Sequence, residues 1–327
     1  KKMYNGKYDL TPEQFQRNLG AVELELFMGG RRVAENYRPY SVYVVAQPGA
    51  GKTALRSAIE VEYQSETADH PFVEFNPDDV AIRHEYYREI LKEYPDESYQ
   101  ILQKFVSPAL DNYLKPKAVE LRSNIIQEGT LANTDAYIKI LDFQKNGGKA
   151  EIGEVQEDGT RKEVDVRGGY FIDINVLAVD RYESLLSSYE REQEFRELGL
   201  PPRAVTEANH DSSYDKILNT INEIENRKLG DRIRIYRRGI VKSMPILVYD
   251  TGRANSSMTA VEKIKEERAN NRKELMINPQ KYLSRISALK DRVKENGTEI
   301  QMEKIDKLEK QFMAELQKNK ERNDEER

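Results

Sequence analysis

Apolar and polar positions divide the first 250 residues into alternating strand-like and helix-like segments. Short runs rich in β-branched and aromatic residues predict strands at 41–46, 71–75, 124–128, 170–179, 233–236 and 245–249. Apolar residues at helical spacing predict helices at 11–36, from after Thr53 to about 63, about 80–123 with breaks near Pro95, Pro108 and Pro116, and 137–144. Strands that alternate with helices are typical of a mainly parallel sheet flanked by helices, so the predicted fold class is α/β.

Two segments depart from this alternation. Residues 145–169 hold two alternating runs around an Asp158-Gly159 turn, which predicts an inserted β-hairpin. After about residue 254 the chain becomes highly charged, and apolar residues recur in steps of three and four on both sides of Gly297, which predicts narrow-striped helices. We favour a helical arm packed on the core, or paired with itself, over a partner-binding arm. The predicted organisation is one domain over 1–254 and a charged helical extension over 255–327.

Composition narrows the functional classes. The chain has 52 basic and 57 acidic residues and a net charge of −5, which counts against a nucleic-acid binder that relies on phosphate neutralisation. The absence of cysteine excludes thiol nucleophiles, thiolate metal sites and disulfides. The sequence contains no apolar run near the roughly 18–20 residues that span a bilayer, and its first residues lack a signal-peptide core. We therefore expect a cytoplasmic protein without membrane contact.

The strongest chemical signal is a glycine-rich turn between a predicted strand and a predicted helix: Gln47, Pro48, Gly49, Ala50, Gly51, Lys52 and Thr53. In a P-loop, successive backbone N–H groups surround the phosphates, the lysine reaches the β- and γ-phosphates, and the hydroxyl ligates Mg²⁺. Ala46 replaces the first glycine of the usual pattern, a mild change at a strand end. The turn predicts a nucleoside triphosphate site, with Lys52 on phosphate and Thr53 on the metal.

Candidate catalytic carboxylates follow the second strand. Asp78 comes directly after it, where ligands of an open α/β sheet collect, and a carboxylate beside the γ-phosphate can accept a proton from an attacking hydroxyl. Asp79 is adjacent, and a helix cap after Pro77 explains the pair equally well on spacing alone. Asp180, after the fourth strand, is a minor alternative as a metal-binding aspartate.

Further candidates lie later in the chain. Glu128 ends the third strand and Thr130 completes the turn after it, facing either a ligand or water. Arg191 lies in a charged predicted helix and Arg203 in the loop that follows. Phosphoryl transfer needs such cations to offset charge on the transferred group, although a lone arginine is more often a solvated surface residue.

These motifs, taken in order, resemble the zeta toxins, the kinase half of epsilon–zeta toxin–antitoxin systems. The resemblance extends from about Val42 to Tyr249. It rests on five segments: 47–59, the Asn-Pro-Asp-Asp of 76–79 with His84 beyond, the Glu-Gly-Thr of 128–130, the Ser-Tyr-Glu-Arg-Glu of 188–192, and 203–211, which ends in His-Asp.

The resemblance implies a P-loop kinase that uses ATP or GTP with Mg²⁺ to phosphorylate the amino-sugar 3′-hydroxyl of UDP-N-acetylglucosamine. Such a product interferes with cell-wall precursor synthesis, and an epsilon-type antitoxin is the implied protein partner. By position, Lys52 and Thr53 match the phosphate and metal residues, and Asp78 matches the catalytic base that contacts the sugar. The resemblance further implies that Glu128 and Thr130 bind the substrate and that Arg191 and Arg203 stabilise the transferred phosphoryl group.

Some features depart from the family. Members of the family have one more acidic residue that contacts the substrate, and this sequence has no match for it; Lys117 falls near that position. Segments 145–169 and 255–327 have no counterpart in the smallest members of the family. Two alternatives stay open: a zeta-like kinase acting on another nucleotide or nucleotide sugar, and a non-catalytic NTP-dependent interaction protein. The charge balance and the absence of tryptophan count against a nucleic-acid end as acceptor.

Overall fold

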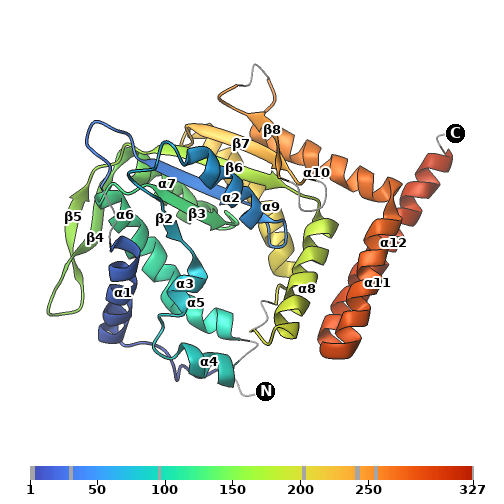
Figure 1. Ribbon diagram of the computed structural model, residues 1–327, viewed down its shortest axis with the longest axis horizontal. Coiled ribbons are helices and arrows are strands. Elements are labelled where there is room, and N and C mark those ends of the chain that lie inside the picture. Colours follow the sequence, from blue (N-terminus) through green and yellow to red (C-terminus); the bar gives the residue numbers. More distant parts are fainter. Residues whose placement is uncertain are drawn as a thin grey trace.

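A six-stranded sheet lies at the centre of the molecule (Figure 1). The computed structural model describes residues 4–28, 32–94, 97–200, 204–239, 244–253 and 257–325. The strand order is β2-β3-β1-β6-β7-β8, and only β8 is antiparallel to its neighbour. The strands are β1 (Tyr40–Val45), β2 (Val73–Phe75), β3 (Ile125–Gly129), β6 (Phe171–Ala178), β7 (Arg232–Arg237) and β8 (Ile246–Asp250). The prediction of a mainly parallel α/β sheet is confirmed.

Helices cover both faces of the sheet. The helices that precede the C-terminal segment are α1 (Pro12–Phe27), α2 (Lys52–Tyr63), α3 (Pro77–Ala81), α4 (Tyr87–Glu93), α5 (Ser98–Pro108), the π-helical η1 (Ala109–Leu114), α6 (Lys115–Glu120), α7 (Thr134–Asn146), α8 (Arg181–Glu197) and α9 (Glu207–Asn226). Strand β1 shows why: Val42 and Val44 pack in the cluster that contains α2, whereas Tyr43 and Val45 pack in the larger core on the other face. Successive strand side chains point to opposite faces, so a wholly apolar strand needs cover on both.

The structure corrects two predicted helices. The first helix ends at Phe27 rather than residue 36, and residues 32–39 are not helical. There the Val33 N–H donates to the carbonyl oxygen of Arg122 at 3.1 Å, so a distant segment takes the backbone bond that a longer helix would have used. Pro108 and Pro116 do not break the next region, because η1 follows Pro108 and Pro116 lies in the first turn of α6, where its missing N–H is tolerated. Pro95 lies outside the described residues.

The predicted hairpin is present as β4 (Gly148–Val155) and β5 (Arg161–Val166), paired antiparallel. It is anchored on neighbouring helices. Ile152 is buried, and the guanidinium of Arg161 pairs with Glu23 of α1 at 2.8 Å and lies over the ring of Tyr113 of η1. The hairpin therefore packs on the α1 side of the molecule.

The charged C-terminal segment forms α10 (Ala260–Ile277), α11 (Pro279–Asn296) and α12 (Glu299–Glu325), and the last two lie beside α8 (Figure 1). Its apolar stripes meet α8 in one hydrophobic cluster: Tyr182, Leu185, Leu186, Tyr189, Tyr282, Ile286, Leu289, Val293, Ile305, Leu308 and Phe312. Helix α10 also joins the main core through Ala260 and Ile264. The interpretation as an arm packed on the core is confirmed, whereas the domain division at residue 254 stays a prediction.

The helices also bear on membrane insertion. Of those the structure describes, none combines the length and the apolar character that crossing a bilayer requires.

Candidate active site

The glycine-rich turn joins the end of β1 to the start of α2 and packs directly against α8. Gly49 and Gly51 have φ values of +75° and +100°, in the left-handed region that favours glycine. A Cβ atom on Gly49 would collide with the carbonyl oxygen of Ser184 and with the hydroxyl of Ser188. The turn therefore has the conformation and the close contact that only glycine permits. It leads into the N-terminus of α2, as a phosphate-binding loop does.

Lys52 lies within this loop. Its Nζ atom donates to the carbonyl oxygens of Ala46 at 3.0 Å and Gln47 at 3.3 Å. Burial lowers the pKa of Lys52 to about 8, the carboxylate of Glu128 opposes that shift, and the guanidinium of Arg191 adds to it. Glu128 and Arg191, two other predicted site residues, therefore lie within electrostatic reach of Lys52.

Glu128 lies at the carboxyl end of β3, next to β1 in the sheet. Arg56, on the first turns of α2, pairs with Glu128 at 3.5 Å and also with Glu74 of β2. The side chain of Glu128 is 25% exposed, so a substrate group can reach it. Thr130, just beyond, is partly buried. Glu128 therefore lies at the carboxyl end of its strand, as the sequence predicted, whereas Glu74 lies within β2 and was not predicted as a site residue.

Asp78 lies in the first turn of α3, and the structure shows how that turn is capped. The side chain of Asn76 accepts a hydrogen bond from the Asp78 N–H at 3.0 Å, so Asn76 is the N-cap. The alternative role of Asp78 as the helix cap is therefore wrong. Burial raises the pKa of Tyr99 on α5, and the Asp78 carboxylate adds to the rise, so Asp78 acts on the α5 side. Asp79 instead adds to the raised pKa of Glu74.

Sequence reasoning missed a group on the η1 side of the site. Burial raises the pKa of Tyr137 on α7, and the carboxylate of Asp111 adds to the rise. The side chain of Asp111 pairs with Lys115 at 2.5 Å, and the hydroxyl of Tyr137 lies where a Cβ on Gly129 would contact it. Lys117, considered near this position, pairs with Glu120 instead. In the sequence, the four-residue spacing between Asp111 and Lys115 was the feature that could have predicted this ion pair on one helix face.

The remaining candidates divide into three cases. Arg191 is on the exposed side of α8, with its guanidinium 5.3 Å from the ring centroid of Phe195. Arg203 lies outside the described residues. Asp180 is buried, and its carboxylate accepts from the Tyr182 N–H at 2.8 Å and from Arg272 at 2.6 Å. Both oxygens of Asp180 are engaged, which favours its role as the cap of α8 over the minor metal-binding alternative.

The donor set for a metal is sparse. In the part of the chain that the structure describes, no three histidine, aspartate or glutamate side chains gather as a metal site. Mg²⁺ in kinases is held by one or two protein oxygens together with substrate phosphates and water, so a full protein cage is not required. The exposed hydroxyl of Thr53, in the first turn of α2, fits such a shared ion.

A phosphate loop between a buried parallel strand and a helix, with carboxylates at neighbouring strand ends, defines a P-loop protein of the α/β class. The chain belongs to the Zeta toxin family, a kinase family, whose profile matches residues 27–158 and 155–254.

Individual relatives are distant. Toxin PezT of Streptococcus pneumoniae serotype 4 is 24% identical over 231 residues, which is 70% of this chain and 79% of the relative. Toxin zeta of Streptococcus pyogenes is 25% identical over 238 residues, 72% of this chain and 71% of the relative. A solved structure from work on the PezAT chromosomal toxin–antitoxin system of S. pneumoniae shares the fold, with a TM-score of 0.64, 21% identity, and coverage of 86% of this chain and 98% of that one.

Proposed function

We propose that this protein transfers the γ-phosphoryl group of ATP or GTP to the 3′-hydroxyl of the amino sugar in UDP-N-acetylglucosamine. The observation that carries the proposal is the phosphate loop between β1 and α2, with Gly49 and Gly51 in the left-handed region and Glu128 at the end of the neighbouring strand β3. The family match supports the reaction class. The acceptor rests on the Glu128-Gly129-Thr130 turn and on Asp78, which match the family's sugar-binding motifs by position.

In this proposal each side chain has a role set by its place. The loop amides and Lys52 bind the β- and γ-phosphates, and Thr53 holds Mg²⁺, which supplies positive charge to the phosphate oxygens when bound. Glu128 and Thr130 bind the sugar. Asp78 accepts the proton of the sugar 3′-hydroxyl while the oxygen of that hydroxyl forms a bond to the γ-phosphorus. The bond between the γ-phosphorus and the oxygen that bridges it to the β-phosphate breaks, and the nucleoside diphosphate leaves.

Charge develops on the transferred phosphoryl group during this step. Arg191 and Arg203 are proposed to offset it, because a guanidinium has several donors in a fixed plane that match phosphate oxygens. Arg191 already lies close enough to Lys52 to lower the pKa of that lysine. Two neighbouring cations repel one another, and an anionic phosphoryl group between them would relieve that repulsion.

The biological role follows from the reaction and the relatives. The solved relative comes from a toxin–antitoxin system, and we propose that this chain is likewise a cytoplasmic toxin held in check by an epsilon-type antitoxin. Phosphorylated UDP-N-acetylglucosamine would interfere with cell-wall precursor synthesis. Expression of the chain alone is expected to arrest growth, and that arrest should disappear in the Asp78→Asn variant.

The acceptor is tested by acceptor-dependent release of ADP in the presence of ATP and Mg²⁺. A panel would contain UDP-N-acetylglucosamine, other nucleotide sugars, free nucleotides and oligonucleotides. The proposal predicts the highest kcat/KM with UDP-N-acetylglucosamine. A higher value with another nucleotide sugar would reassign the acceptor and keep the kinase class. Tight ATP binding without turnover on any acceptor would favour the non-catalytic NTP-dependent interaction protein.

A further inference from the structure

One residue of the phosphate loop is held by three distant elements. The side chain of Gln47 is completely buried. Its amide nitrogen donates to the carbonyl oxygen of Val179 at 2.8 Å, after β6, and to the hydroxyl of Ser184 on α8 at 3.1 Å. Its amide oxygen accepts from the guanidinium of Arg268 on α10 at 3.4 Å. The position of this side chain is therefore determined by the sheet, by α8 and by the C-terminal helices together.

The main chain of Gln47 belongs to the phosphate loop itself. Its carbonyl oxygen accepts from the Ala50 N–H and from Lys52 Nζ, both at 3.3 Å. A shift of the Gln47 side chain would therefore move the carbonyl that contacts the phosphate-binding lysine. Amides and charges that stabilise phosphate work best when they are fixed before the ligand arrives.

Arg268 is an unusual residue for this position. It is 4% exposed, and burial lowers its pKa. Its guanidinium stacks 3.7 Å from the ring centroid of Tyr214 on α9 and donates to the Tyr214 carbonyl oxygen at 2.9 Å. Its Nε atom has no hydrogen-bond partner, and among the described residues the carboxylates of Asp215 and Asp180 act on the guanidinium electrostatically without forming an ion pair with it.

A buried cation without an ion pair costs more than an apolar side chain of similar size. Simple packing between α9 and α10 would therefore favour a methionine or leucine over Arg268. The guanidinium does what those residues cannot: it donates to the amide oxygen of Gln47. Its charge also lies behind a loop that binds anions, in surroundings where water screens it little.

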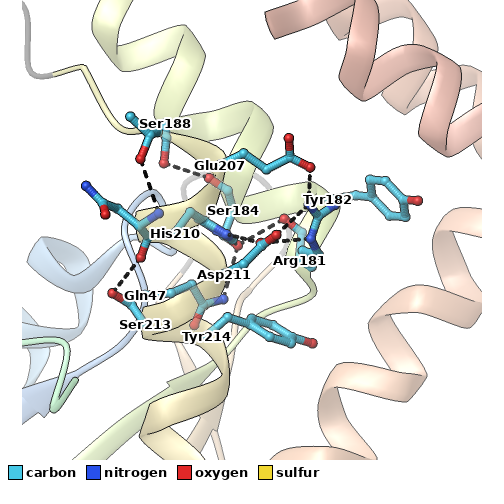
Figure 2. Close-up of polar contacts among 12 residues, drawn as sticks. Gln47, Arg181, Tyr182, Ser184, Ser188, Glu207, His210, Asp211, Ser213 and Tyr214 are labelled. Carbon is cyan, nitrogen blue, oxygen red and sulfur yellow. Dashed lines mark hydrogen bonds and ion pairs between the residues drawn. The ribbon is translucent and has the colours of Figure 1, made fainter. Parts of the chain in front are cut away.

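A second chain of contacts supports Gln47 through Ser184 (Figure 2). The Ser184 hydroxyl lies 2.8 Å from Nε2 of the buried His210, whose Nδ1 lies 3.1 Å from Asp211. Asp211 pairs with Arg181 at 2.8 Å, and Arg181 pairs with Glu207 at 2.6 Å. Glu207 accepts from Gln311 of α12 at 2.8 Å. Polar contacts thus connect the phosphate loop with both α10 and α12.

We propose that Arg268 is a positioning residue for the phosphate donor, and that it acts by fixing Gln47 and thereby the phosphate loop. This inference rests on the proposed nucleotide-dependent function but on no particular acceptor. Residue 268 lies beyond position 254, where the family match ends. The C-terminal helices therefore complete the donor site of this chain as well as packing on α8.

The test measures nucleotide affinity directly, with a fluorescent ATP analogue and Mg²⁺ and no acceptor. Arg268→Met is expected to weaken binding about tenfold or more, as loss of a hydrogen bond from a charged donor would. The nucleotide affinity of Arg268→Lys should lie between those of the unaltered chain and Arg268→Met, because lysine keeps the charge and loses the planar donor geometry. Arg292→Gln is the matched control: this α11 arginine pairs with Glu197 on α8 at an exposed site, so affinity should be unchanged.

A double variant separates positioning from general stability. If Arg268 acts through Gln47, then Gln47→Ala with Arg268→Met should bind nucleotide no more weakly than the weaker single variant. In turnover assays KM for ATP should rise while KM for the acceptor stays within about twofold. The inference is overturned if Arg268→Met binds nucleotide like the unaltered chain, or if the two losses multiply. A wrong acceptor would leave these binding results intact, so the two proposals fail separately.

Discussion

The Nζ atom of Lys52 lies 3.0 Å from the carbonyl oxygen of Ala46, the last residue before the phosphate loop. The ammonium group thus donates a hydrogen bond to the main chain six residues before it, and a second one to the carbonyl oxygen of Gln47. These carbonyl dipoles hold the charged end of a partly buried side chain where the loop closes. The same burial lowers the pKa of Lys52 to about 8, which makes its charge sensitive to pH near neutrality.

Nucleotide affinity should therefore fall as the pH rises through about 8. Lys52 is charged below its pKa and neutral above it, and only the charged form attracts phosphate. Measurement of the Kd for the ATP analogue from about pH 6.5 to about pH 9.5 would show weaker binding above the pKa that Lys52 has in the nucleotide-free protein. In the Lys52→Arg variant this decline should disappear, because arginine stays charged. A Kd that stays constant to about pH 9.5 in the unaltered chain would contradict the assignment.

Replacement of Asp78 should separate binding from turnover. Asp78→Asn removes a proton acceptor, and general-base help is typically worth about 10²–10⁴-fold, so kcat should drop by that factor while ATP binding persists. Asp79→Asn is the matched control, since the neighbouring carboxylate acts on Glu74 rather than on Tyr99. Steady-state kinetics on both variants decide the matter. Equal losses in the two variants would remove the distinction between the two carboxylates.

Substitution of Gly49 should disable the loop through both strain and collision. In Gly49→Ala the left-handed backbone costs about 1–2 kcal/mol, and the new Cβ would collide with the Ser184 carbonyl oxygen. Gly199 is the control, because it has a φ of +68° and a Cβ added there would meet nothing within 4 Å. Denaturant unfolding should show a larger decrease in the free energy of unfolding for Gly49→Ala than for Gly199→Ala. Binding of the ATP analogue should weaken only in Gly49→Ala. Similar unfolding free energies for the two variants would count against the close packing on α8.

A buried ion pair supports the helix that follows the loop. Arg234 of β7 pairs with Asp173 of β6 at 2.5 Å, both almost fully buried, and with Glu62 of α2 at 2.6 Å. Arg234→Met leaves Asp173 buried without its cation, which should cost about 3–5 kcal/mol of unfolding free energy. Adding Asp173→Leu to that variant should recover most of the loss, as measured by urea denaturation. A loss below about 1 kcal/mol in the single variant would show that the pair is better solvated than its burial implies.

The sheet was predictable from local pattern, and the reasons are visible in single strands. In β1 every residue after Tyr40 is buried, because helices cover both faces, and that produces the continuous apolar run. The end of the first helix was not predictable, because the N–H of Val33 bonds to Arg122, which is far along the chain. Pro108 was expected to break a helix, and a π-helical turn continues it instead.

The site shows the same limit. The loop and the carboxylates at strand ends follow from short motifs, whereas excluding Asp78 as the helix cap needed the side chain of Asn76 in place. The contact of Arg268 with Gln47 joins residues 221 positions apart. No spacing rule reaches that far, and the charged composition after residue 254 predicted a packed helical arm without indicating which of its residues would contact the loop.

The product of one reaction shows most directly whether this protein phosphorylates UDP-N-acetylglucosamine. Purified protein would be incubated with ATP, Mg²⁺ and UDP-N-acetylglucosamine, and the nucleotide sugar analysed by tandem mass spectrometry and phosphorus NMR, with Asp78→Asn in parallel. We expect one added phosphoryl group on the 3′-oxygen of the amino sugar, formed by the unaltered chain and nearly absent from the variant. An unmodified nucleotide sugar in the presence of bound ATP, or equal product from both proteins, would contradict it.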